Sequence, residues 1–154
     1  MKNKILLFGT NYYPEPIGIP RYTTEMAEFL VKNNYDVSVI CAKPLYPDWK
    51  KKIGFNYLSY SKSIINNVNV YRVPTYTPKN NSFIQRSIYE LIFFITSLPL
   101  LIYLSQKKYK NICITLPPFF LGIVFFIPFL WKKKFLITKD LQIDIAKNLR
   151  LIKN

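Results

Sequence analysis

Residues 11–30, NYYPEPIGIPRYTTEMAEFL, directly follow the apolar run ILLFG at residues 5–9, and together they decide the fold. A short apolar run, then a loop with proline and glycine, then a helical pattern is the opening of a doubly wound α/β domain. Such a domain binds its ligand where the first strand ends. The loop after Gly9 is therefore predicted to be a ligand loop.

The second half of this stretch has the spacing of an amphipathic helix. Apolar side chains recur at i, i+4, i+7 and i+8, with polar ones on the other side, and this apolar set is Tyr22, Met26, Phe29 and Leu30. Pro20 suits the first turn because proline has no N–H to leave unsatisfied there and its φ is already helical. Asn33 and Asn34 take the place of the glycine that often ends a helix.

Gly18 lies just before this helix. Its backbone can approach a ligand closely because it carries no Cβ. The free N–H groups and the positive dipole end of the helix would favour a phosphate or carboxylate at this position. The alternative interpretation is that Gly18 only makes a turn.

The rest of the chain predicts one parallel sheet. Strands are expected at residues 2–9, 36–42, 68–73, 111–116 and 134–138, with helices over 119–131 and within 140–151. Residues 43–79 are otherwise expected to be a loop whose aromatic side chains pack down and whose lysines face solvent or lipid headgroups. With the strand order 3-2-1-4-5, ligands would sit at the carboxyl ends of the first and fourth strands.

Two long apolar runs, residues 83–105 and 112–131, leave a second interpretation open. Each is about long enough to cross a bilayer, so the alternative is a small basic membrane-associated protein with two apolar segments and no catalysis. Glu90 interrupts the first run and three prolines break the second. Lysine and arginine lie before, between and after the runs, which is not the one-sided excess that orients a membrane hairpin. We therefore expect the first run to be a long helix, covered by the sheet on one side and resting on a membrane surface on the other.

The 154 residues suit one domain, residues 1–154, with a net charge of +14 from 22 basic and 8 acidic side chains. Residues 1–42 carry four of each sign, whereas residues 43–86 carry eight basic and one acidic, and residues 87–154 carry ten and three. Such an excess suits nucleic acid, an anionic membrane surface or phosphate-bearing substrates. Because no recognition motif accompanies it, no specific nucleic-acid partner is expected.

The two cysteines, Cys41 and Cys113, are too few and too far apart for a disulfide framework, and the chain has no histidine. Both fall inside expected strands. They are therefore expected to be core thiols in a reducing compartment, and no metal site is expected.

Residues 11–49, NYYPEPIGIPRYTTEMAEFLVKNNYDVSVICAKPLYPDW, resemble the start of the GT-B glycosyltransferases of family 4, in particular the colanic-acid and fucosaminyltransferase-like members of bacterial polysaccharide gene clusters. The segments VYRVPTYTPK, ICITLPPFF and ITKDLQIDIA follow in the order of the family's later landmarks. Where relatives usually have a second glycine this chain has Pro20, which removes one N–H from the predicted anion site. The resemblance implies a Rossmann-like doubly wound parallel sheet with helices on both faces, the N-terminal half of a GT-B fold.

The resemblance also implies a function. In that family this half receives the acceptor, and a second domain binds the nucleotide-sugar. The implied activity is transfer of a sugar from a nucleotide-sugar to a lipid-linked or saccharide acceptor in cell-surface polysaccharide biosynthesis, without a metal. Residues 1–154 hold no second Rossmann-like unit, so the chain alone is expected to bind acceptor weakly and not to transfer sugar. Three alternatives stay open: a truncated reading frame, an excised piece of a longer protein, and one half of a split enzyme whose partner is a separate C-terminal half. The expected location is the cytoplasm, peripheral to the inner face of the cytoplasmic membrane.

Three loops would meet at the ligand edge of the sheet, formed by residues 10–21, 115–119 and 139–144. The expected acceptor-binding residues are Gly18 for close backbone approach, Arg21 for phosphate contact, and Glu15, Asp140 and Asp144 for sugar hydroxyls. For each charged residue the alternative is a solvated loop charge. No catalytic residue is identified: where many members of the fold have histidine before an aspartate, this chain has Lys139, and a lysine moves protons near neutral pH only if burial lowers its pKa.

Overall fold

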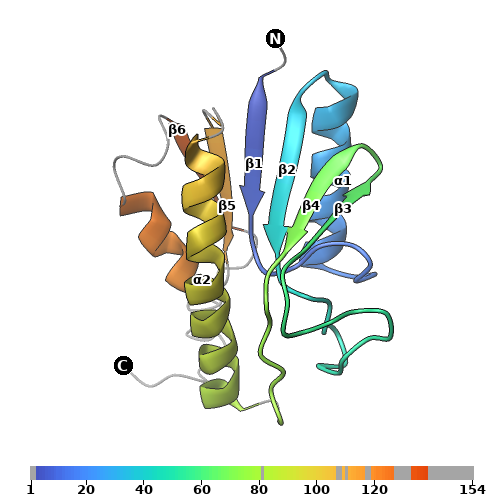
Figure 1. Ribbon diagram of the computed structural model, residues 1–154, viewed down its shortest axis with the longest axis vertical. Coiled ribbons are helices and arrows are strands. Elements are labelled where there is room, and N and C mark those ends of the chain that lie inside the picture. Colours follow the sequence, from blue (N-terminus) through green and yellow to red (C-terminus); the bar gives the residue numbers. More distant parts are fainter. Residues whose placement is uncertain are drawn as a thin grey trace, which may run out of the picture.

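The computed structural model describes residues 3–80, 82–106, 109, 111–116, 119–126 and 133–138. Within these residues one six-stranded sheet is covered on its two faces by two α-helices (Figure 1). The strands are β1 (Lys4–Phe8), β2 (Asp36–Cys41), β3 (Ser61–Ile65), β4 (Val68–Arg72), β5 (Asn111–Leu116) and β6 (Lys133–Thr138). The predicted α/β fold with a mostly parallel sheet is therefore confirmed.

The strand order is β3-β4-β2-β1-β5-β6, and every neighbouring pair is parallel except β3 and β4. Without β3 this is the predicted order 3-2-1-4-5. The chain winds outward from β1 to β2 and β4, and then crosses back to place β5 on the other side of β1. The winding thus reverses at β1, so the loops after β1 and β5 leave the sheet beside one another.

Helix α1 (Ile19–Lys32) covers one face of the sheet. It begins after Gly18, whose φ of 72° is a left-handed conformation that glycine adopts without a Cβ clash, and Pro20 lies in its first turn as predicted. Asn33 is the C-terminal cap and Asn34 has a φ of 67°. The inner side of α1 buries Ala27 against the apolar side chains of β1 and β2.

Helix α2 (Phe83–Gln106) covers the opposite face and runs antiparallel to β1, with its first turns projecting beyond the carboxyl ends of the strands (Figure 1). Its inner side buries Tyr89, Phe93, Leu101 and Leu104 in a core shared with β1, β2 and β5. The rings of Phe8 and Phe93 stack with their centroids 5.6 Å apart. The predicted long helix that the sheet covers on one side is therefore confirmed.

The part Phe83–Leu104 of this helix is long and apolar enough to cross a membrane by length and composition, and 28% of its most apolar window is buried inside the protein. The second apolar run behaves differently. Its first residues belong to β5, which pairs with β1 and β6, and the 3₁₀ helix η1 (Phe119–Phe126) follows. That run is therefore not one continuous helix. The helix predicted over residues 119–131 is a 3₁₀ helix over 119–126, while residues 127–131 lie outside the described part.

Strand β3 is an addition to the prediction, which placed residues 61–65 in a loop. It forms a hairpin with β4 through a two-residue turn, because Ile65 pairs with Val68. Asn66 and Asn67 in that turn have φ values of 49° and 63°, and asparagine tolerates this left-handed region better than most residues. The helix expected within residues 140–151 lies outside the described residues.

Both cysteines are free thiols within strands, as predicted. Cys41 in β2 is fully buried, and Cys113 in β5 is partly buried. Burial raises the pKa of each thiol to about 11, which leaves very little thiolate at neutral pH.

Candidate functional site

At the carboxyl edge of the sheet, the backbone hydrogen bonds between β1 and β2 continue into the first residues of the loops that follow these strands. Gly9 donates its N–H to the Ile40 carbonyl at 3.2 Å, and Ala42 donates to the Thr10 carbonyl at 2.9 Å. A Cβ on Gly9 would lie 3.1 Å from Cβ of Thr115, so β1 and β5 approach closely at this edge. The strand ends therefore form a rigid base from which the loops after β1 and β2 rise.

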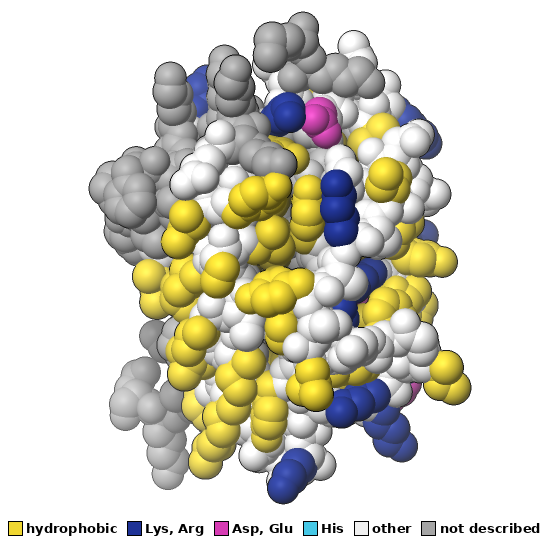
Figure 2. Space-filling model, viewed as in Figure 1, with side chains coloured by type: hydrophobic (Ala, Val, Ile, Leu, Met, Phe, Trp, Pro, Cys, Tyr) yellow, Lys and Arg dark blue, Asp and Glu magenta, His cyan; other side chains and the backbone are white. Residues whose placement is uncertain are grey.

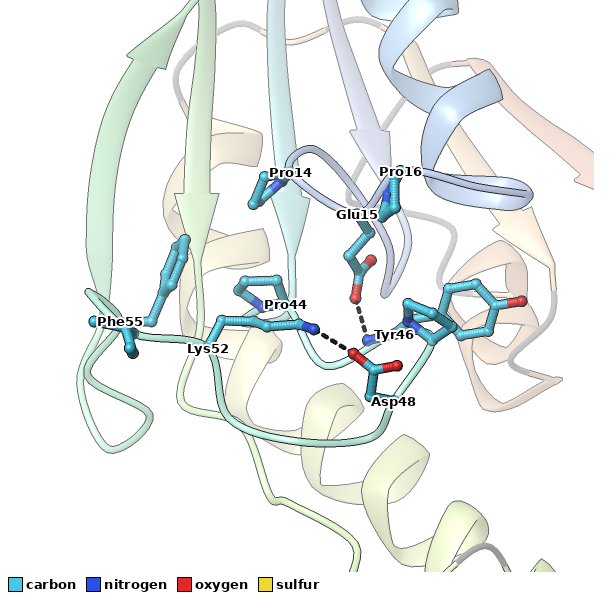
Figure 3. A pocket seen from close by; sticks show the side chains of 10 residues that line it. Pro14, Glu15, Pro16, Pro44, Tyr46, Asp48, Lys52 and Phe55 are labelled. Atoms are coloured by element: carbon cyan, nitrogen blue, oxygen red, sulfur yellow. Dashed lines mark hydrogen bonds and ion pairs between the residues drawn. The ribbon is translucent and has the colours of Figure 1, made fainter.

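These two loops enclose a pocket of about 510 Å³ (Figure 3). Its walls are mainly the rings of two aromatic and four proline side chains, and its charged groups are two carboxylates and one ammonium group. The lining residues are Pro14, Glu15, Pro16, Pro44, Tyr46, Pro47, Asp48, Lys52, Ile53 and Phe55. A wall of apolar rings with a few charged groups suits a ligand that has both C–H faces and polar edges.

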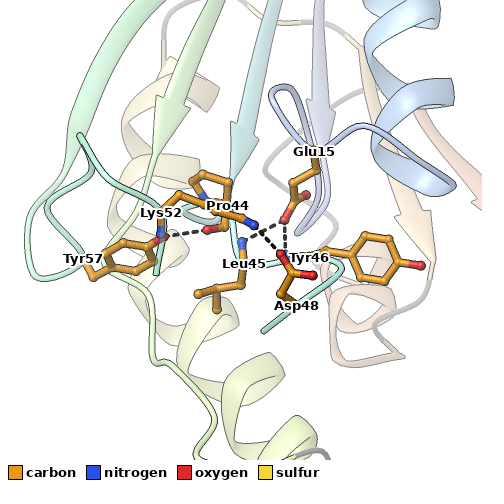
Figure 4. Close-up of polar contacts among 7 residues, drawn as sticks. All are labelled: Glu15, Pro44, Leu45, Tyr46, Asp48, Lys52 and Tyr57. Atoms are coloured by element: carbon orange, nitrogen blue, oxygen red, sulfur yellow. Dashed lines mark hydrogen bonds and ion pairs between the residues drawn. The ribbon is translucent and has the colours of Figure 1, made fainter. Parts of the chain in front are cut away.

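Glu15 fastens the two loops together (Figure 4). Its Oε1 accepts the backbone N–H groups of Leu45 at 2.9 Å and Tyr46 at 2.8 Å, and its Oε2 accepts Nδ2 of Asn11 at 3.1 Å. The side chain is only 6% exposed. Burial raises the pKa of the carboxyl group, against the opposing effect of these hydrogen bonds and of the Arg72 guanidinium. Glu15 is therefore a buried acceptor for backbone amides, and its predicted contact with a sugar hydroxyl stays a prediction.

Arg72, at the end of β4, is hydrogen-bonded to the loop after β1 and to the loop after β2. It is 3% exposed, and its Nη1 donates to the Ala42 carbonyl at 3.0 Å and contacts Sγ of Cys41 at 3.3 Å. Its Nη2 donates to the Tyr13 carbonyl, and its guanidinium lies 5.3 Å from the ring centroid of Phe55. The sequence indicated that Arg72 is buried, because this residue follows Val68 and Val70 at the alternate, inward positions of a strand.

The accessible charges of the pocket are Asp48 and Lys52. Lys52 Nζ lies 2.6 Å from Asp48 Oδ2, and both side chains are partly exposed to solvent. The Lys52 hydrogen bond lowers the pKa of Asp48, so this carboxylate is ionised at neutral pH. Tyr57 orders the backbone here, since its hydroxyl donates to the Pro44 carbonyl at 2.5 Å and accepts the Lys52 N–H at 2.8 Å (Figure 4).

The sequence-predicted site residues do not all gather at this pocket. Glu15 lines it, whereas Arg21 lies on the exposed side of α1 and pairs with Glu25 at 2.8 Å. Gly18 faces open space, because a Cβ built there would meet nothing within 4 Å. Asp140 and Asp144 lie outside the described residues. Sequence reasoning missed Asp48 and Lys52, whose signal was the charge pair at i and i+4 in a loop rich in proline and aromatic residues.

Within the part of the chain that the structure describes, no group of three histidine, cysteine or carboxylate side chains could hold a metal ion. The buried hydroxyl of Tyr12 has no hydrogen-bond partner, and burial raises its pKa. Since Tyr12 packs in the apolar core under α1 and does not line the pocket, we assign it no role in ligand binding.

No protein-family model matches the chain. Over 109 residues the chain is 38% identical to a protein of Escherichia coli (strain K12) that is named, provisionally, as the colanic acid biosynthesis glycosyl transferase WcaI. The alignment covers 70% of this chain and 26% of WcaI, so the chain matches about a quarter of that relative's length. This similarity confirms the resemblance to a colanic-acid glycosyltransferase-like domain. The alternative, a membrane-associated protein without catalysis, is not favoured.

Proposed function

We propose that this chain is the acceptor-binding domain of a glycosyltransferase that moves a sugar from a nucleotide-sugar to a lipid-linked or saccharide acceptor during cell-surface polysaccharide synthesis. The proposal rests on the similarity to WcaI, together with a ring-walled pocket at the carboxyl edge of a doubly wound sheet. Because the alignment covers 26% of WcaI, the activity of a complete enzyme is part of the proposal.

The pocket supports an acceptor sugar by its chemistry. A pyranose ring has C–H faces that pack on apolar rings. The planar rings of Tyr46 and Phe55 and the pyrrolidine rings of four prolines offer such surfaces. Its hydroxyl groups can donate to Asp48 and accept from Lys52 at the rim of the pocket. A phosphate on the acceptor would pair with Lys52 in place of Asp48, since ammonium groups bind phosphate as point charges.

The remaining parts of the proposal follow from the family resemblance. The donor is bound by a second, GT-B-type half, on a longer chain or on a separate C-terminal partner, and transfer needs no metal. The resemblance offers Gly18 and the start of α1 as the alternative to Lys52 for contact with the substrate's anionic group, with Asp140 and Asp144 as further polar contacts. The domain works in the cytoplasm at the inner face of the cytoplasmic membrane and binds no specific nucleic acid.

Saccharide binding tests the proposal directly. The ¹⁵N-labelled chain is titrated with neutral disaccharides, with a sugar phosphate and with a nucleotide-sugar, and the amide chemical shifts are followed. We expect the disaccharides and the sugar phosphate to move the amides of Tyr46, Asp48 and Lys52, at millimolar affinity for a site without its second half. Shifts confined to surfaces away from these residues would disprove the pocket assignment.

Two matched ion pairs sharpen the test. Asp48→Asn and Lys52→Met remove the charges of the pocket pair, whereas Glu25→Gln removes one charge of the i, i+4 pair on α1. We expect Lys52→Met to weaken sugar phosphate binding about tenfold and Asp48→Asn to weaken disaccharide binding about tenfold, and the α1 variant to leave both unchanged. The variant Arg21→Met tests the prediction that Arg21 contacts a phosphate. Arg21→Met should weaken sugar phosphate binding only if Arg21 makes that contact. Rapid turnover of a nucleotide-sugar by the isolated chain would contradict the assignment of the donor site to a second half.

A further inference from the structure

The outer side of α2 carries a continuous apolar stripe. Ile84, Ile88, Leu91 and Ile95 follow one another at intervals of four, three and four residues, so they share one side of the helix. Their side chains are 69%, 36%, 42% and 54% exposed. Figure 2 shows hydrophobic side chains gathered on this face of the molecule, over α2. A stripe of this length costs free energy in water, so it indicates an apolar partner.

The helix is fixed to the domain by its other side, so leaving the sheet to cross a bilayer would break these contacts. Phe93 is fully buried on the sheet, and the Tyr89 ring meets the Trp49 ring edge-on at 5.4 Å. The hydroxyl of Tyr60 also donates to the Thr96 carbonyl at 2.7 Å. Extraction of α2 into a bilayer would expose the apolar core that it shares with Phe8. The partner must therefore accept the stripe while the helix stays on the sheet.

The charge around the stripe identifies the partner as anionic. Residues 43–86, which include the loop beside α2 and its first turn, carry eight basic and one acidic side chain, and of the basic ones only Lys43 and Arg72 are buried. Lysine and arginine side chains border the apolar face on its right and lower sides in Figure 2. An apolar helix side bordered by basic residues is the pattern of a segment that lies in the interface of an anionic bilayer.

We propose that α2 lies flat on an anionic phospholipid bilayer, with Ile84, Ile88, Leu91 and Ile95 among the acyl chains and the neighbouring basic side chains on the headgroups. This proposal specifies how the domain contacts the membrane that is part of the proposed function. It rests on the proposed function only for the consequence at the pocket. The loop of residues 42–60 packs on the first turns of α2 through Trp49, which also lies 5.5 Å below the Arg86 guanidinium. The docked orientation therefore holds the pocket close to the headgroups, where a lipid-linked acceptor presents its sugar.

Vesicle co-sedimentation of the full chain tests the docking. Phosphatidylcholine vesicles with and without phosphatidylglycerol are compared, at low salt and at about 0.5 M NaCl, where charge attraction is screened beyond a few ångströms. We expect binding to the anionic vesicles, a marked loss at high salt, and little binding to the neutral ones. The double variant Ile88→Glu/Ile95→Glu should bind the anionic vesicles roughly tenfold more weakly, because it places charge where acyl chains are expected.

The matched control is Phe29→Glu, which removes a 64% exposed apolar side chain from α1 on the opposite face of the sheet and should leave vesicle binding unchanged. Circular dichroism checks that each variant is folded, and the milder Ile88→Ser/Ile95→Ser variant replaces the glutamate variant if that one unfolds. The proposal is overturned by equal binding of wild type and stripe variant, by equal binding to neutral vesicles, or by release from membranes only in detergent. It is also overturned if the stripe instead mediates a concentration-dependent dimer that the variants abolish. Saccharide titration in solution reports on the pocket separately, so either proposal can fail without the other.

Discussion

Oε1 of Glu15 accepts the backbone N–H of Tyr46 at 2.8 Å, although 31 residues separate them in the chain. The same oxygen accepts the neighbouring N–H of Leu45, so one buried carboxylate holds the loop after β1 against the loop after β2. Both loops line the pocket. The shape of the candidate site is therefore set by a contact between a side chain and the backbone.

Glu15→Ala should destabilise the protein by about 2–4 kcal/mol, because it leaves two backbone donors and the Asn11 amide without an acceptor in a buried place. Glu15→Gln keeps one carbonyl acceptor and should cost less, about 1–2 kcal/mol. Urea unfolding of the three proteins measures the difference. If the alanine variant is as stable as the wild type, the carboxylate does not hold the loops.

Arg72→Met should destabilise the protein by about 3 kcal/mol or more, since the Ala42 and Tyr13 carbonyls lose their donor and Glu15 loses a nearby positive charge. Arg72→Lys should recover only part of this loss, because an ammonium group cannot reproduce the planar fork of donors that serves both carbonyls. The readout is the free energy of unfolding in urea. Full stability of the lysine variant would argue against a need for the fork geometry.

Gly9→Ala should cost about 1–3 kcal/mol, because the new Cβ would lie 3.1 Å from Cβ of Thr115 and β1 and β5 would have to separate. Gly122→Ala is the matched control. A Cβ there meets nothing within 4 Å, so this substitution should be neutral or slightly stabilising. Thermal unfolding compares the two variants, and equal effects of both would mean that the approach of β1 to β5 is not tight.

Glu90 on α2 gives a prediction for pH. Burial raises the pKa of its carboxyl group from the ordinary 4.5 to about 7, against the opposing charge of Arg86. Because the folded state binds the proton more tightly, its contribution to stability is fully present below pH 4.5 and is lost as the pH rises through about 7. Glu90→Gln stays neutral, so the stability difference between the variant and the wild type should grow in the variant's favour from pH 4 to pH 8.

Urea titrations of both proteins at several pH values provide this measurement. The difference between them isolates Glu90, because Glu15 and the other titratable groups are common to both chains. A difference that does not change with pH, or one that changes in the opposite direction, would show that Glu90 is not buried as the structure describes.

The first βαβ unit was predictable because its signals are local. Gly18, Pro20 and Asn33 mark the ends of α1 within a few residues, and the apolar runs on either side of it can only be buried strands. The order of the parallel strands then follows from the general rules for such folds. The edge strand β3 was not predicted because four of its five residues are exposed, so its sequence shows no alternation of apolar and polar side chains. The Asn66–Asn67 turn was its only local signal.

The candidate site was predicted less well, for a different reason. Glu15 and Arg21 looked alike in the sequence, as charged residues beside a glycine in a ligand loop. In the folded chain one is buried under backbone amides and the other pairs with Glu25 in solvent. Which of these occurs depends on the segment that lies opposite, and for Glu15 that segment comes 30 residues later. Local patterns place the loops at the edge of the sheet, but the contacts between loops decide which side chains remain available.

The fastening of the two loops through main-chain amides has an evolutionary consequence. Leu45 and Tyr46 contribute only their N–H groups to Glu15, and every amino acid except proline has such a group. Tyr46, Asp48 and Lys52 can therefore be exchanged for other side chains while the frame around them persists. A lineage that keeps one glutamate and one arginine can thus change the side chains that line the pocket, without having to rebuild the scaffold at each step.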